Sequence, residues 1–223
     1  NLTVRVTDNG SPVLYSEATV TITVTPSNQP PVINDQSFSI AENSGNGTNI
    51  GTIVASDPDA GQILSYSIIS GNSNNAFAVN SASGLLSVAN SAALNFEITP
   101  NYTLIVRVTD NGTGNLWTEA SLSITIININ ELPVMNGQSF VVDENAPVGT
   151  MVGTMIATNP DQGQTILYSI LSGNTDNAFV INSTTGAITV INPAALNYEN
   201  NPAFTLVIQA LDNGTPALSV SAN

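Results

Sequence analysis

The chain repeats itself at a constant offset of 102 residues, with no gap between the copies. The triplet Asp-Asn-Gly begins at Asp8, Asp110 and Asp212, and the same offset relates Glu42 to Glu144. A fixed period near 100 residues marks a tandem array in which each unit is a whole small domain. Acidic residues and turn glycines recur most faithfully, beside the apolar positions that a core needs. We therefore expect an array built around a repeating cation.

Length and hydropathy bound the kind of protein. The 223 residues hold two complete periods and a remainder, and 42% of them are hydrophobic. No apolar run approaches the roughly 20 residues of a membrane-spanning helix. The chain begins inside a repeat without a signal peptide, so we expect a segment of a longer protein. Any membrane attachment then belongs to parts of the protein outside this segment.

The charge balance excludes several classes of function. There are 16 acidic residues against two basic ones, Arg5 and Arg107, and the net charge is −14. Such a surface repels phosphate backbones, which argues against nucleic-acid binding. Lysine, histidine and cysteine are absent. Their absence removes thiol and imidazole nucleophiles, Schiff-base chemistry and the usual zinc sites.

Short alternating segments dominate the first complete unit, residues 31–130. Seven predicted strands cover 37–42, 51–57, 64–69, 77–80, 85–88, 103–110 and 121–127. A turn with Gly84 where positive φ is needed joins the fourth and fifth of them. The stretch 91–97 is the only helix-tolerant one, and Pro193 begins its counterpart. Seven strands with turn signals between them predict an all-β fold, a Greek-key β-sandwich of immunoglobulin-like type.

The alternation also predicts a core. The inward-facing side chains are expected to be Phe38, Ile40, Ile53, Ile68, Phe77, Val79, Leu86, Leu104, Val106, Val108, Ile124 and Ile126.

Two short proline-terminated linkers, 24–32 and 127–134, set the expected boundaries. Residues 1–27 are predicted to be the C-terminal hairpin and linker of an upstream repeat. Residues 28–130 are predicted to be a complete repeat, and 131–223 a repeat whose last strand stops early. Such linkers keep adjacent domains from swinging freely. Either the chain is a section of a continuous tandem array, or the hairpin docks on a neighbouring copy of the chain.

Five motifs occur in a fixed order in the second repeat. They are D-E-N-A-P-V-G-T (143–150), A-T-N-P-D (157–161), F-V-I-N-S-T-T-G-A-I (179–188), L-N-Y-E (196–199) and A-L-D-N-G-T-P-A-L-S (210–219). This series resembles the x-E-N, A-x-D-x-D, F-x-I-x-x-x-T-G-x-I, L-D-R-E and A-x-D-x-G-x-P-x-L-S of cadherin repeats. The resemblance covers essentially the whole chain. The linker between the repeats is similar to the shortened form found in bacterial members of that family.

The resemblance implies Ca²⁺ at the domain junctions, where carboxylates from two repeats and their linker supply the 6–8 oxygen ligands. At the inner junction, between 28–130 and 131–223, the matching residues are Glu42, Glu97, Asn128, Asn130, Glu131, Asp161 and Asp212. At the upstream junction, before residue 31, they are Asn28, Asp57, Asp59 and Asp110. At the downstream end they are Glu144 and Glu199.

The chain departs from the family pattern at several of these positions. Asparagine replaces an expected aspartate at Asn95, Asn128, Asn159 and Asn197. An asparagine offers a carbonyl oxygen but no formal charge. We therefore expect fewer or weaker ions than the three per junction of the family, with binding at extracellular calcium concentrations.

The implied function is that of a calcium-rigidified adhesive or structural stalk at the cell surface. Its expected partners are neighbouring repeats, with homophilic contact or a cell-surface glycan as further partners. The rival functions are a polysaccharide-binding module, against which the 5% aromatic content argues, and a self-assembling filament subunit.

Trp117 and Tyr15 occupy equivalent positions, either anchoring a partner or sugar ring or capping the sandwich edge. Asp57 and Asp59 resemble a catalytic pair, but nothing else builds a substrate cleft, so no enzyme is expected.

Overall fold

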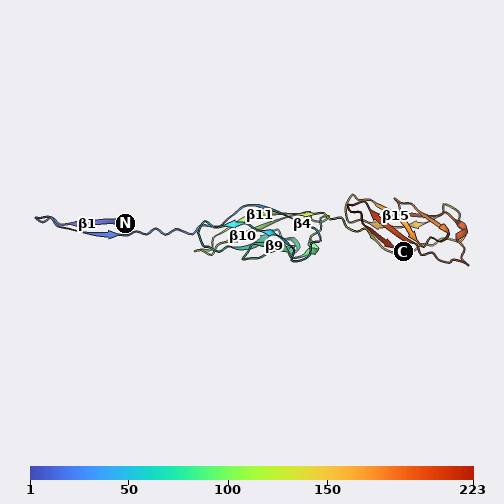
Figure 1. Ribbon diagram of the computed structural model, residues 1–223, viewed down its shortest axis with the longest axis horizontal. Helices are drawn as coiled ribbons and strands as arrows, with labels where there is room; N and C mark the ends of the chain where they lie inside the picture. Colours follow the sequence, from blue (N-terminus) through green and yellow to red (C-terminus); the bar gives the residue numbers. More distant parts are fainter.

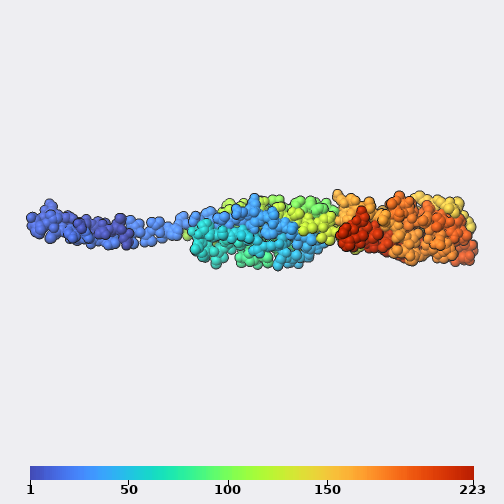
Figure 2. Space-filling model, turned by 45° about the horizontal axis from the view of Figure 1, so that its top comes forward, coloured from blue at the N-terminus to red at the C-terminus, as the bar shows by residue number.

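Three units follow one another along a line in the computed structural model, which describes all residues from Asn1 to Asn223 (Figure 1). The first is a hairpin of β1 (Leu2–Thr7) and β2 (Tyr15–Val20), followed by an extended linker. Two larger units come after it, and Figure 2 shows them abutting end to end. We call them the first and second repeat. No helix of the chain has the length and hydropathy needed to cross a bilayer.

The hairpin pairs as predicted for the start of the chain. Its strands are antiparallel, with Leu2 opposite Val20 and Thr7 opposite Tyr15. Every residue of both strands is exposed, including the apolar Val4 and Val6. An isolated two-stranded hairpin gains little from burial.

The first repeat is all β, as predicted, with its strands in separate packed sheets. Its strands are β3 (Val32–Ile33), β4 (Gln36–Ala41), β5 (Asn49–Thr52), β6 (Ala55–Ser56), β7 (Ser65–Ser70), β8 (Phe77–Val79), β9 (Leu85–Val88), β10 (Asn101–Thr109) and β11 (Trp117–Ile127). One sheet has the order β4-β11-β10-β7, the second β5-β9-β8, and β3 pairs with β6. The β4–β11 pair is parallel and the others are antiparallel.

The core lies between these sheets and matches the predicted inward face. Eight of the twelve predicted residues are buried, and Phe38, Ile40, Ile68 and Val79 pack against them partly buried. Because side chains alternate along a strand, β10 buries every second residue. Burying each large apolar side chain contributes about 1.5–3 kcal/mol. Tyr102, which the prediction omitted, lies edge-to-face on Phe77 with ring centroids 5.0 Å apart.

The predicted strand 51–57 is instead two strands. β5 pairs with β9, whereas β6 pairs with the two-residue β3. Between them Ile53, 1% exposed, enters the core and its N–H donates to Gly84 O at 2.9 Å. The chain therefore crosses from one sheet to another at this residue. The helix-tolerant stretch forms single 3₁₀ turns, η2 (Ser91–Ala93) and η4 (Pro193–Ala195).

The second repeat has the same plan with a smaller core of 11 buried residues against 16 in the first. Its elements are β12 (Val134–Met135), β13 (Met151–Thr154), β14 (Ala157–Thr158), β15 (Ile166–Ser172), β16 (Phe179–Ile181), β17 (Ala187–Val190), β18 (Val207–Asp212) and β19 (Ser219–Ala222). Two further 3₁₀ turns are η1 (Ser73–Asn75) in the first repeat and η3 (Thr175–Asn177) in the second.

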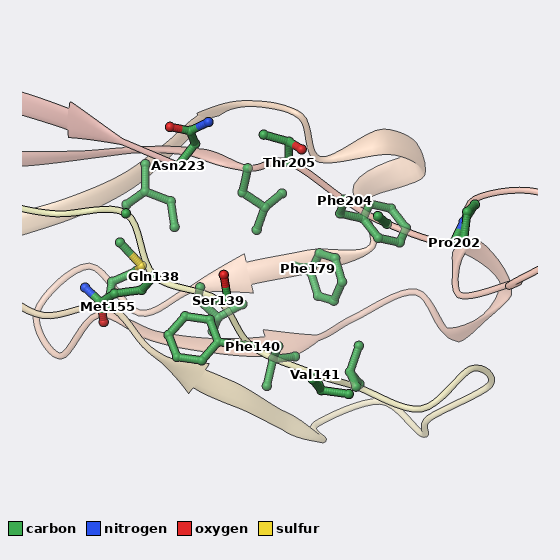
Figure 3. A pocket seen from close by; sticks show the side chains of 17 residues that line it. Gln138, Ser139, Phe140, Val141, Met155, Phe179, Pro202, Phe204, Thr205 and Asn223 are labelled. Carbon is green, nitrogen blue, oxygen red and sulfur yellow. The ribbon is translucent and has the colours of Figure 1, made fainter.

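One edge of the second repeat is open. Residues 138–143, the counterpart of β4, form no strand, and β19 pairs only with β18. A pocket of about 540 Å³ lies beside this segment, lined mostly by apolar side chains such as Phe140, Phe179 and Phe204 (Figure 3). In the first repeat the β4–β11 pair occupies the corresponding place. The pocket is thus an uncovered edge of the core, and it lies apart from the carboxylates described next.

Candidate metal centre

Three glutamates that are distant in sequence meet where the first repeat joins its linker. Glu42 follows β4, Glu97 follows the η2 turn, and Glu131 lies in the linker. One carboxylate oxygen of each lies within 4.8 Å of the others. Carboxylates this close repel one another unless a cation or a proton lies among them.

Glu42 is held by the backbone on both sides. It is 3% exposed, and its Oε1 accepts a hydrogen bond from Ile129 N and its Oε2 one from Phe96 N, both at 2.8 Å. The parallel pairing of β4 with β11 brings it there, because Glu42 N donates to Ile127 O at 3.0 Å. Glu42 therefore fixes the start of the linker to the end of the first repeat.

Glu97 and Asp161 present buried oxygens that have no hydrogen-bond partner. Both carboxylate oxygens of Glu97 and Oδ1 of Asp161 are in this state, and Asp161 is 3% exposed. Desolvation by burial raises the pKa of Glu97, and repulsion from Glu42, Glu131 and Asp161 raises it further. Leaving a buried acceptor unpaired costs about 1–3 kcal/mol, and more when it is charged. A ligand that supplies positive charge would satisfy these oxygens.

No basic side chain of the chain neutralises the cluster. Arg5 pairs with Glu17 at 2.6 Å, across the two strands of the hairpin, and Arg107 pairs with Glu119 at 2.8 Å, across β10 and β11. The chain has no other basic residue. A cluster of hard carboxylate oxygens fits Ca²⁺ better than a soft transition metal.

Asp161 connects the second repeat to this cluster. Its Oδ2 accepts a hydrogen bond from Glu131 N at 2.8 Å, and its own N–H donates to Asn159 Oδ1 at 3.1 Å. The first repeat, the linker and the second repeat thus each contribute a carboxylate to the same region.

Asn130 and Asp212 lie together on the side of the second repeat. Asp212, 2% exposed, accepts from Gly214 N at 3.0 Å and Leu218 N at 2.8 Å through Oδ1, and from Asn130 Nδ2 at 3.2 Å through Oδ2. A Cβ on Gly214 would clash with Asn130 Oδ1, and one on Gly112 would clash with Asn28 Oδ1. This close approach requires a glycine at the end of the triplet at these two positions, whereas Gly10 in the hairpin has no such neighbour.

Gln164 belongs to this group and was missed from the sequence. Its Nε2 donates to Asn130 Oδ1 at 2.6 Å, and its Oε1 accepts from Asn159 Nδ2 at 3.0 Å. The signal that could have found it is the period itself, because Gln62 lies 102 positions earlier. Asn128, by contrast, is exposed and makes no side-chain hydrogen bond.

The predicted upstream residues are also brought together. Asn28 Nδ2 donates to Asp110 Oδ2 at 3.0 Å, and Asp59 Oδ2 accepts from Gln29 N at 2.7 Å. Asp57 Oδ1 accepts from Asp59 N at 2.8 Å, while its Oδ2 is buried without a partner.

The downstream pair and two of the substituted asparagines behave differently. Glu144 and Glu199 are both exposed, and Glu144 accepts one hydrogen bond, from Tyr198 N at 3.3 Å. The side chains of Asn95 and Asn197 accept hydrogen bonds from the backbone three residues later, at 2.8 and 2.9 Å. These asparagines close local turns with their carbonyl oxygens.

The two repeated aromatic residues each lie under an arginine. The guanidinium carbon of Arg5 is 4.2 Å from the Tyr15 ring centroid, and that of Arg107 is 4.2 Å from the Trp117 centroid. A cation–π contact of this kind occupies one face of each ring. The arrangement favours a cap on the strand edge over an aromatic platform for sugars.

Comparison with known proteins gives one consistent result. The Cadherin domain family model matches residues 36–127 and 138–223. Protocadherin Fat 4 of Mus musculus is 34% identical over 230 residues, covering 98% of this chain and 4% of that protein. Protein dachsous of Drosophila melanogaster is 34% identical over 229 residues, covering 96% of this chain and 6% of that protein.

A solved structure, mouse Cadherin-23 EC22-24, is 28% identical with a TM-score of 0.66, covering 99% of this chain and 71% of the other. These relatives come from animals, so the bacterial type stays a prediction. The chain spans only 4% and 6% of the two curated relatives. Since the family model matches most of the chain, in two successive copies, the chain belongs to the cadherin domain family.

Proposed function

We propose that this chain is an extracellular segment of a cell-surface protein in which Ca²⁺ stiffens neighbouring cadherin repeats into an adhesive or structural stalk. The ion is held at the inner junction by Glu42, Glu97, Glu131 and Asp161. The observation that carries the proposal is the set of buried, unpartnered oxygens of Glu97 and Asp161, from two different repeats, at the same junction.

The chemistry of the donors supports calcium over other cations. The set consists of carboxylate oxygens only, with no nitrogen or sulfur ligand. Calcium accepts many oxygens in flexible geometry, whereas magnesium demands a nearly ideal octahedron. The bound ion supplies two positive charges, which offset the mutual repulsion of the carboxylates.

The backbone contacts explain why ion binding would stiffen the array. Glu42 fixes Ile129 of the linker to the first repeat, and Asp161 fixes Glu131 of the linker to the second. Repulsion within the carboxylate cluster works against both attachments. A bound cation offsets this repulsion, so that both attachments are strengthened and the two repeats keep one relative orientation.

Most of the other predicted ligands lie at the upstream junction and at the downstream end. Asn28, Asp57, Asp59 and Asp110 form a similar group at the upstream junction. Glu144 and Glu199 are exposed and are proposed as ligands only where a further repeat packs against them. Asn128 stays a prediction. The extracellular location is part of the proposal, because the asparagine substitutions are expected to weaken calcium binding and calcium is abundant outside cells.

Thermal unfolding of the full chain in calcium and in EDTA tests the proposal. We expect the unfolding midpoint to rise in millimolar calcium, because an ion that binds only the folded chain stabilises it, by an amount that reaches about 2.7 kcal/mol at 100-fold excess over Kd. Equal magnesium should produce no comparable rise. Small-angle scattering should show a longer maximum dimension in calcium than in EDTA.

A midpoint and a scattering profile that ignore calcium would overturn the proposal. In that event, titration with polysaccharides and sedimentation across a range of concentrations would test the two rival functions. Binding of a sugar would favour the polysaccharide-binding module, and concentration-dependent polymerisation would favour the filament subunit.

A further inference from the structure

Five side chains at the inner junction have counterparts 102 positions earlier at the upstream junction, and four of the five are identical. The matching pairs are Asn28 and Asn130, Gln62 and Gln164, Asp59 and Asp161, Asp110 and Asp212, and finally Asp57 and Asn159. Only the last pair changes chemical type, from a carboxylate to an amide. The hydrogen bonds around it change accordingly.

At the inner junction, three amides form an unbroken series of hydrogen bonds. Asn159 Nδ2 donates to Gln164 Oε1 at 3.0 Å, and Gln164 Nε2 donates to Asn130 Oδ1 at 2.6 Å. Asn130 Nδ2 then donates to Asp212 Oδ2 at 3.2 Å and to Pro216 O at 2.8 Å. Each amide is both donor and acceptor, and the series ends on a buried carboxylate.

At the upstream junction the first donor of this series is missing. Gln62 still donates to Asn28, and Asn28 still donates to Asp110. Asp57 Oδ2 and Gln62 Oε1, however, are buried acceptors and neither has a partner. They are the counterparts of the two atoms that are bonded at 3.0 Å in the second repeat.

Turning the amides over cannot repair the upstream series. It has a carboxylate at each end, Asp57 and Asp110, and two amides between them, so three contacts share the donor ends of two side chains. Reversing Gln62 only moves the acceptor–acceptor contact one position along, to Asn28. At the inner junction Asn159 replaces this carboxylate. Three amide donors then serve three contacts, and no acceptor in the series stays without a partner.

We infer that Asn130, Asn159, Gln164 and Asp212 form an amide lock, a hydrogen-bonded group that holds the linker on the second repeat without a cation. The inner junction is then divided in two. The side of Glu42, Glu97 and Glu131 requires a cation, and the side of the amide lock does not. The division rests on the proposed function, whereas the lock rests on its hydrogen bonds alone.

A pair of reciprocal substitutions tests the lock in the full chain. Asn159→Asp gives the inner junction the upstream chemistry, and Asp57→Asn gives the upstream junction the inner chemistry. In EDTA we expect Asn159→Asp to lower the unfolding midpoint and Asp57→Asn to raise it. Isothermal titration should count one more calcium ion per chain for Asn159→Asp than for the wild type. Unchanged midpoints in EDTA together with an unchanged ion count would overturn the inference.

Nuclear magnetic resonance of the wild-type chain supplies a measurement that needs no variant. In EDTA the side-chain amide protons of Asn130, Asn159 and Gln164 should exchange with solvent at least tenfold more slowly than those of exposed Asn128. Exchange as fast as Asn128 would overturn the lock. Slow exchange in a chain that binds no calcium would keep the lock and refute the proposed function, so the two failures are distinguishable.

Discussion

Glu42 and Glu144 occupy the same position in successive repeats, yet their surroundings are opposite. Glu42 is buried and accepts two backbone hydrogen bonds at 2.8 Å, one from the linker and one from its own repeat. Glu144 is exposed and keeps only the bond from its own repeat, lengthened to 3.3 Å. The difference is the linker contact of Ile129.

Glu97 and Glu199 differ in the same way. Both oxygens of Glu97 are buried without partners, and burial together with Glu42, Glu131 and Asp161 raises its pKa. Glu199 is exposed. A single repeat therefore supplies the carboxylates, but the linker and the following repeat bury them and bring them together. The candidate metal centre is a property of the junction.

The sharpest way to break this comparison is to remove the two matched glutamates separately. Glu97→Ala should abolish most of the rise in unfolding midpoint that calcium produces, because it deletes a central carboxylate of the cluster. Glu199→Ala should leave that rise intact. Calorimetric unfolding in calcium and in EDTA measures both. Equal losses in the two variants would show that the site does not depend on the junction.

A second, smaller difference concerns the chain without any ion. Glu42→Ala leaves the N–H groups of Ile129 and Phe96 without their acceptor, so we expect a loss of about 1–3 kcal/mol in the free energy of unfolding in EDTA. Glu144→Ala, at an exposed position, should change it by less than about 0.5 kcal/mol. Urea unfolding followed by far-ultraviolet circular dichroism, which reports on the strands of both repeats, would measure both losses. A loss for Glu144→Ala as large as for Glu42→Ala would contradict the role of the linker.

The strands and the core of the first repeat were predictable because they depend on local periodicity. Residues such as Leu104, Val106 and Val108 alternate on one strand and face one core. The break at Ile53 was not predictable in this way, because it depends on which distant strands accept each half of the segment. The pairing of β3 rests on only two residues, too few to show a period.

The sequence named several residues that the structure places together, but it did not indicate the hydrogen bonds among them. The resemblance named Glu42, Glu97 and Glu131, and the structure brings them within 4.8 Å. It did not indicate that Asn130 and Asp212 would satisfy each other or that Gln164 would join them. Amides in loops are common and carry no signal of their partners, since hydrogen bonds between distant loops exist only after folding.

The smallest expected effect is on the pH dependence of thermal stability in EDTA, compared between variants of Glu97 and of Glu199. The raised pKa of Glu97 means that the folded state disfavours its ionised form. Its ionisation therefore costs stability at neutral pH, and the cost disappears as pH falls through the raised pKa toward the ordinary one. Glu97→Gln should unfold at a higher temperature than the wild type at pH 7, and this advantage should shrink toward pH 4. Glu199→Gln should show no such trend, and an advantage for Glu97→Gln that grows on acidification would refute the repulsion within the cluster.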